Sequence, residues 1–172
     1  MKVLILYASH TGNTEKIASA IYEEASKKHS AELKKLKDVN PNSLSDFDQV
    51  FIGSPINAGK IVKEVSEFLN KLPRLPEMKL AGFITHAAPA YPKQTIDDMT
   101  QPFADACEAK DMEYKGCFSC QGYLADFMHE AVQKMQKAGN EAWQKKVEQM
   151  TGHPNTDDEA NARVFAASAL SQ

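Results

Sequence analysis

The chain has 172 residues, a length that favours a single domain able to bury its own core. Its 20 lysine and arginine residues are offset by 23 aspartate and glutamate residues, giving a net charge of −3, and this balance argues against nucleic-acid binding. No apolar stretch approaches the roughly 20 residues of a membrane-spanning helix, and three cysteines are too few for a disulfide framework, so we expect a cytoplasmic protein without membrane insertion.

Strands and helices are expected to alternate along most of the chain. Apolar runs typical of strands buried on both faces occur at residues 2–8, 49–53, 79–86 and 112–118, with a weaker run at 31–36. Apolar residues recur at helical spacing between these runs. This alternation predicts a mostly parallel sheet with right-handed crossovers and helices on both faces.

The end of the chain is less regular. Two groups keep helical spacing after the fifth strand, one being Leu124, Met128, Ala131 and Met135 and the other Trp143, Val147 and Met150. We interpret residues 119–155 as a helical insertion within one domain that spans residues 1–172. Its methionines could offer adaptable contacts, although core packing explains them more simply. Thr156 and Glu159 have the spacing of a capping box, which predicts the start of a final helix.

The loop after the first strand has an unusual composition for a turn. It consists of Ser9, His10, Thr11, Gly12, Asn13 and Thr14, and a helix begins within it. Unpaired N–H groups at a helix N-terminus attract a phosphate, glycine allows a close approach, and hydroxyls can donate hydrogen bonds. Helix capping alone would also favour serine, threonine and asparagine here. Three hydroxyls, one amide and one glycine in six positions favour a phosphate site held together without any lysine or arginine side chain.

Residues 4–18, Leu-Ile-Leu-Tyr-Ala-Ser-His-Thr-Gly-Asn-Thr-Glu-Lys-Ile-Ala, resemble the flavodoxin signature. The resemblance implies a three-layer, doubly wound α/β fold with five parallel strands in the order 2-1-3-4-5. It also implies flavin mononucleotide (FMN) as cofactor, with its phosphate held by residues 9–14.

Two further loops are expected to flank the flavin ring by the same resemblance. The first follows the third strand and contains Ser54, Pro55, Ile56, Asn57 and Ala58; the second follows the fourth strand and contains His86, Ala87, Ala88 and Tyr91. Asn57 and Gly59 tolerate left-handed backbone geometry. Ile56 stands where some flavodoxins carry a stacking aromatic residue, whereas Tyr91 could stack from the second loop. An ordinary turn and a structural histidine remain the alternatives for these loops and for His86.

Cys117 and Cys120 have the spacing of a redox pair, but they occur at the end of a predicted strand. Residues three apart in a strand point to opposite faces, so two buried thiols are favoured over a dithiol. Four ligands at zinc spacing are absent from the sequence, so no metal site is predicted. No residue stands out as a catalytic acid, base or nucleophile.

These observations favour an FMN-binding electron-transfer protein that serves a redox partner protein and acts as a monomer or weak dimer. Two alternatives remain open: an FMN-dependent reductase of a quinone or another unsaturated small molecule, and a flavodoxin-like docking subunit. A net charge of −3 is weak for electrostatic steering toward a basic partner. The insertion at 119–155 could form either a substrate wall or a partner surface, so whether the chain is an enzyme stays open.

Overall fold

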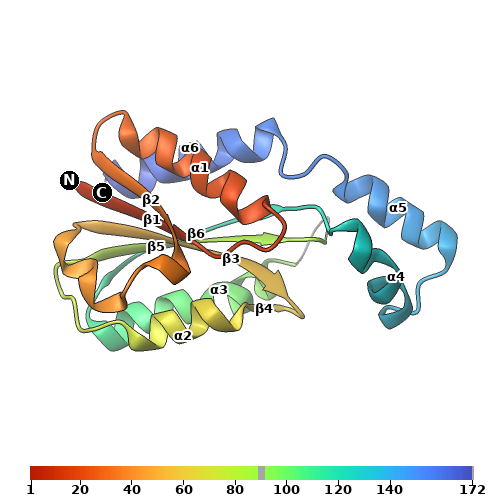
Figure 1. The fold of residues 1–172 in the computed structure, drawn as a ribbon, viewed down its shortest axis with the longest axis horizontal. Coiled ribbons are helices and arrows are strands. Elements are labelled where there is room, and N and C mark those ends of the chain that lie inside the picture. Colours follow the sequence, from red (N-terminus) through yellow and green to blue (C-terminus); the bar gives the residue numbers. More distant parts are fainter. Residues whose placement is uncertain (89–91, 172) are drawn as a thin grey trace.

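A sheet between two layers of helices forms the body of the molecule (Figure 1), and the computed structural model describes residues 1–88 and 92–171 of the chain. The strands of the sheet are β1 (Lys2–Tyr7), β2 (Ser30–Lys35), β3 (Gln49–Asn57), β4 (Lys60–Ile61), β5 (Lys79–His86) and β6 (Glu113–Gln121). The α-helices are α1 (Asn13–Ser26), α2 (Lys63–Lys71), α3 (Lys93–Lys110), α4 (Asp126–Met135), α5 (Asn140–Met150) and α6 (Thr156–Ser171). Two 3₁₀ turns, η1 (Leu36–Asp38) and η2 (Pro41–Asp46), connect β2 to β3.

The five long strands are parallel and lie in the order β2-β1-β3-β5-β6, while the two-residue strand β4 pairs antiparallel with the end of β3. With β4 left out of the count, this is the predicted order 2-1-3-4-5, so the doubly wound fold is confirmed. The chain leaves β1 toward one edge of the sheet to form β2 and later toward the other edge to form β3. Ligands of such sheets bind at this switch point, outside the carboxyl ends of the strands.

Each face of the sheet has its own core. Leu4 and Leu6 of β1 belong to the core under α2 and α3, whereas Val3 and Ile5 belong to the core under α1 and α6. All four side chains are buried, which explains the unbroken apolar run in the sequence. Because both faces of β1 are covered, the loop that follows it starts from a rigid base.

Two strands are longer than predicted, and both extensions change the loops that follow them. β3 continues to Asn57 and turns through Ala58 (φ 48°) and Gly59 (φ 77°) into β4, so the left-handed pair is Ala58 and Gly59, not Asn57 and Gly59. β6 continues to Gln121 because its pairing with β5 resumes after a register shift near Gly82 and runs on to His86. The segment interpreted as a helical insertion therefore follows β6 from residue 122, because residues 119–121 belong to the strand.

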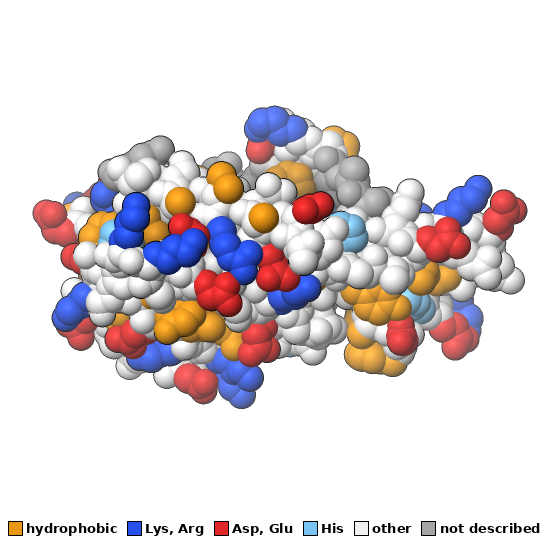
Figure 2. All heavy atoms as spheres, turned by 90° about the horizontal axis from the view of Figure 1, so that it is seen from above, with side chains coloured by type: hydrophobic (Ala, Val, Ile, Leu, Met, Phe, Trp, Pro, Cys, Tyr) orange, Lys and Arg blue, Asp and Glu red, His pale blue; other side chains and the backbone are white. Residues whose placement is uncertain are grey.

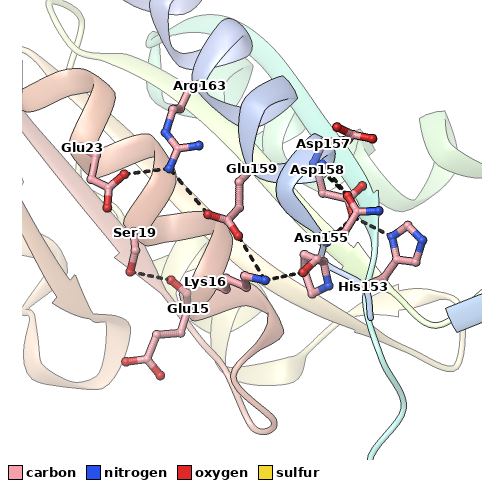
Figure 3. Close-up of polar contacts among 11 residues, drawn as sticks. Glu15, Lys16, Ser19, Glu23, His153, Asn155, Asp157, Asp158, Glu159 and Arg163 are labelled. Carbon is pink, nitrogen blue, oxygen red and sulfur yellow. Dashed lines mark hydrogen bonds and ion pairs between the residues drawn. The ribbon is translucent and has the colours of Figure 1, made fainter. Parts of the chain in front are cut away.

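The final helix is capped one residue earlier than predicted (Figure 3). Asn155 Oδ1 accepts hydrogen bonds from the backbone N–H groups of Asp157 (2.9 Å) and Asp158 (3.0 Å), and Asp158 Oδ2 accepts one from the Asn155 N–H (2.8 Å). The capping box thus consists of Asn155 and Asp158, so the predicted pair of Thr156 and Glu159 is wrong.

Glu159 instead joins α6 to α1. Its carboxylate lies 3.1 Å from Lys16 Nζ and 3.5 Å from an Arg163 guanidinium nitrogen, which in turn lies 2.7 Å from Glu23 (Figure 3). Lys16 also donates to the carbonyl of Pro154 (2.6 Å). These contacts bind the helix that follows the predicted phosphate loop to the helix that ends the chain.

The two cysteines of the strand end lie on opposite faces, as predicted. Cys117 packs against the core under α2 and α3, and Cys120 belongs to the core under α1 and α6. Burial raises the pKa of both thiols well above the usual value, so neither is poised as a thiolate.

Among the described residues, no group of histidine, cysteine, aspartate or glutamate side chains is arranged to hold a metal ion. None of the described helices combines the length and apolar character needed to cross a membrane.

Candidate functional site

A cavity of about 270 Å³ opens at the carboxyl ends of β1, β3 and β5, where the fold places ligands. It is lined by residues of the loop after β1, the β3–β4 hairpin, the end of β5 and the insertion: His10, Thr11, Asn13, Pro55, Ile56, Asn57, Ala58, Gly59, Val62, Thr85, His86, Ala87, Tyr123, Leu124, Ala125, Met128, Val132, Met135 and Gln136. A larger cavity of about 450 Å³ lies on the other side of His10, between β2 and α2, away from both predicted ring loops. The smaller cavity is therefore the candidate site.

The N-terminus of α1 faces this site without a side-chain cap. Gly12 occupies the N-cap position with φ 89°, and no side chain among the described residues bonds to the first N–H groups of the helix. A Cβ atom built on Gly12 would meet nothing within 4 Å, so the space in front of the helix is open. A 14-residue helix with free N–H groups at an open N-terminus presents the donors that a phosphate requires.

Two hydroxyl groups stand beside these donors. Ser9 Oγ accepts a hydrogen bond from the Gly12 N–H (3.1 Å), which holds the loop in shape, and Thr11 is exposed at the mouth of the cavity. His10 lies between the two cavities, with its Nε2 atom 3.4 Å from a Glu64 carboxylate oxygen. The donor set fits a phosphate, since the loop adds no carboxylate of its own.

The side chains of Asn13 and Thr14 are engaged elsewhere. Asn13 Nδ2 donates to the backbone carbonyl of Tyr123 (2.7 Å), and the buried hydroxyl of Thr14 lies 2.8 Å from the hydroxyl of Thr85. Only the backbone N–H groups of these two residues are left to meet a ligand. Their side chains position the loop against the start of the insertion and the end of β5.

The first predicted ring loop is a hairpin. Pro55, Ile56, Asn57 and Ala58 line the cavity. Ser54 is fully buried, and its hydroxyl accepts a hydrogen bond from the Val62 N–H (3.0 Å) and donates to the Pro55 carbonyl (2.8 Å). Ser54 therefore holds the hairpin against the start of α2 and does not face the cavity.

The second predicted ring loop follows β5, and His86 and Ala87 line the cavity there. The His86 ring is 8% exposed and is held at both nitrogens, with Nδ1 2.9 Å from the Ala88 carbonyl and Nε2 3.0 Å from Ser119 Oγ. Burial lowers the pKa of His86 below its ordinary value, so the ring is neutral near pH 7. Ala88 contributes the backbone carbonyl that holds the His86 ring. The prediction for Tyr91 falls outside the described residues.

Helix α4 lines the site, although the sequence analysis named none of its residues among the site residues and left the role of residues 119–155 open. Leu124, Met128, Val132 and Met135 line the cavity, yet α4 contributes no buried residue and belongs to neither core. The helical spacing of these residues was visible in the sequence, but the same spacing is typical of a core helix. Interpreting Met128 and Met135 as core residues is therefore wrong, whereas Met150 is buried as that interpretation expected.

Comparison with known proteins agrees with the fold. The model of the flavodoxin domain matches residues 4–167. An uncharacterized protein of Methanocaldococcus jannaschii is 30% identical over 171 residues, covering 99% of both chains. The flavodoxin-like domain-containing protein BilS of Clostridioides difficile is 30% identical over 183 residues, covering 99% of this chain and 97% of BilS.

Among solved structures, oxidised flavodoxin 2 of Bacillus cereus has a TM-score of 0.68 at 18% identity, with 99% of each chain covered. A flavodoxin of Streptococcus pneumoniae has a TM-score of 0.67 at 14% identity, again with 99% of each chain covered. At these identities the structural matches establish the fold.

Proposed function

The chain belongs to the flavodoxin domain family, and from this premise we propose that it binds FMN at the carboxyl ends of β1, β3 and β5 and passes electrons to a redox partner protein. The observation that supports the proposal most directly is the open N-terminus of α1. Its first N–H groups lack a side-chain cap, and the exposed hydroxyl of Thr11 lies beside them.

The residues of the loop after β1 have distinct tasks in this proposal. The backbone N–H groups of Asn13 and Thr14, together with the hydroxyls of Ser9 and Thr11, would hold the phosphate. The side chains of Asn13 and Thr14 keep the loop in place through Tyr123 and Thr85. A binding site without lysine or arginine neutralises the phosphate with the helix dipole and hydrogen bonds.

The ring of FMN would lie between the β3–β4 hairpin and the end of β5. Pro55, Ile56 and Ala87 offer small or aliphatic contacts there, and the fixed, neutral ring of His86 adds no charge. When bound, FMN supplies the redox chemistry, taking up electrons from a donor and releasing them to an acceptor. The chain binds and orients the cofactor and excludes water from its surroundings.

A second function is favoured by one specific feature, the wall that α4 adds to the cavity. An electron carrier needs only an exposed ring edge, whereas an enzyme needs a chamber for its substrate. The apolar lining from Leu124 to Met135 could shape such a chamber for a quinone or another unsaturated molecule. We keep an FMN-dependent reductase as the alternative function.

Three free cysteines, two of them buried, agree with a reducing compartment, and we propose the cytoplasm as the place of action.

A flavin titration tests the binding proposal. FMN is added to flavin-free protein while the quenching of flavin fluorescence is followed, and saturable binding at micromolar concentration or tighter is expected. A colourless protein that leaves FMN fluorescence unchanged at these concentrations would contradict the proposal.

The holoprotein then separates the two functions. After chemical reduction without air, an electron carrier should reduce cytochrome c, a one-electron protein acceptor, and should oxidise neither NADH nor NADPH. Steady oxidation of NADH or NADPH that depends on added quinone would instead support the reductase.

A further inference from the structure

Helix α4 has an apolar stripe that no core uses. Leu124 precedes the helix, and Met128, Val132 and Met135 follow at intervals of four, four and three residues, which places all four on one face. All four line the candidate cavity. In soluble proteins an apolar helix stripe is normally buried against other elements, so this stripe calls for an occupant of the cavity.

The stripe is distinct from the rest of the helix. Phe127, the residue directly before Met128, is 85% exposed and lies outside the cavity lining. Figure 1 shows α4 and α5 beyond the carboxyl edge of the sheet, and Figure 2 shows hydrophobic side chains gathered at that end of the molecule. Met135 at the far end of the stripe is also largely exposed, so the half-buried part of the stripe that faces the cavity consists of Leu124, Met128 and Val132.

Helix α5 holds α4 in this position. The ring of His129 on α4 meets the ring of Trp143 on α5 edge to face, with their centroids 5.7 Å apart, and Trp143 is buried. Gln133 Nε2 donates to Asn140 Oδ1 (2.9 Å), which joins the two helices near their turn.

The segment that leads from β6 into α4 is attached to the predicted phosphate loop. Asn13 Nδ2 donates to the Tyr123 carbonyl, and a side chain at Gly122 would collide with Asn13, since a Cβ there would lie 2.7 Å from Nδ2. The stripe is thus connected directly to the loop on which a cofactor would depend.

The opposite side of the cavity leaves a flat ring poorly covered. Of the described residues that line it from the β3–β4 hairpin and from β5, Ile56 is the largest apolar side chain, and His86 is the only one with a ring that could stack. Methionine adapts to irregular surfaces and makes favourable contacts with aromatic rings. Helix α4 supplies the apolar surface that the β3–β4 hairpin lacks.

We propose that α4 is a lid for the flavin ring, in which Met128 and Val132 pack against the ring and keep water from it. This inference rests on the proposed FMN binding and goes further, because it assigns a cofactor contact to the insertion. The lid makes part of the binding energy depend on residues 122–155.

The test uses isosteric polar substitutions on the stripe and a matched control on the same helix. Met128→Gln and Val132→Thr are combined in one variant, and Phe127→Gln is the control. The double variant should bind FMN roughly tenfold more weakly, since apolar area is lost from the contact. Phe127→Gln should bind FMN like the unaltered chain, and Met128→Leu, which keeps the apolar contact, should do the same.

Two spectroscopic readouts report on the lid without any turnover. The visible band of bound FMN should show the fine structure typical of an apolar setting in the unaltered protein and should lose it in the double variant. Trp143 is the only tryptophan of the chain and packs beneath α4, so FMN binding should quench its emission.

The outcomes separate the lid from the proposed function. If the double variant keeps both the affinity and the band shape of the unaltered chain, the lid is overturned and FMN binding stands. If the unaltered chain fails to bind FMN, the proposed function is overturned and the lid with it. Circular dichroism of each variant confirms that the helices are retained.

Discussion

The hydroxyls of Thr14 and Thr85 lie 2.8 Å apart in the interior, although the two residues are separated by 71 positions in the chain. Thr14 stands in the first turn of α1 and Thr85 near the carboxyl end of β5. This contact fixes the start of the helix at one height above the sheet. The predicted phosphate loop and the end of β5 therefore form one unit.

Thr85→Val should destabilise the protein, because it leaves the buried Thr14 hydroxyl without a partner. The expected loss is roughly 1–3 kcal/mol of unfolding free energy, measured by urea denaturation. The double variant Thr14→Val with Thr85→Val should recover much of that loss, since no orphaned hydroxyl remains. Equal losses in the single and double variants would show that the hydroxyl pair is not responsible.

Thr11→Asp should abolish FMN binding without unfolding the protein. The new carboxylate would stand before the N-terminus of α1 and repel the phosphate, yet the same charge is favourable to the helix dipole. Fluorescence titration should find no saturable binding, while urea denaturation should find unchanged or slightly higher stability. Thr11→Ser is the control and should bind FMN normally; normal binding by Thr11→Asp would refute our placement of the phosphate.

Asn155→Ala should cost about 1 kcal/mol of stability, the usual value for losing an N-cap side chain. Its Oδ1 atom accepts two backbone hydrogen bonds at the start of α6. Thr156→Ala serves as the comparison and should have little effect, because Thr156 is not the cap. The reverse ranking of these two variants in thermal or urea denaturation would restore the capping box expected from the sequence.

His86 should make the protein less stable in mild acid. Burial lowers the pKa of His86 in the folded state below the ordinary value of 6.5, so the unfolded chain takes up the proton first as the pH falls. The contribution of His86 is therefore fully present above pH 6.5 and is lost as the pH falls from 6.5 toward the folded-state pKa.

Urea denaturation at pH 7.5 and at about pH 5.5 measures this dependence. His86→Gln should show a smaller loss between the two pH values than the unaltered chain. His10→Gln, a change at an exposed position, should keep the full loss. An identical pH dependence in the unaltered chain and in His86→Gln would exclude His86 as the source.

The local pattern of residues was enough to predict a parallel sheet with alternating helices, whereas the order of its strands was implied by the resemblance to flavodoxins, and the phosphate loop stays a prediction. Val3, Leu4, Ile5 and Leu6 are apolar in succession because both faces of β1 are covered, and that requirement is written directly into the sequence. The uncharged loop from Ser9 to Thr14 likewise shows its chemistry in its composition. Both features involve consecutive residues, so they can be recognised in the sequence without knowledge of the fold.

Contacts between distant residues could be decided only in the folded molecule. Asn13 meets Tyr123 and Thr14 meets Thr85, so the side chains of two residues predicted to hold the phosphate are engaged within the protein. Asn155 caps the final helix, and Glu159, the expected capping partner, pairs with Lys16 and Arg163 instead. The stripe on α4 has the periodicity of a core helix, but the insertion leaves the body of the domain, so the stripe lines the cavity instead. Periodicity reveals which side of a helix is apolar, whereas only the path of the chain in space determines what that side faces.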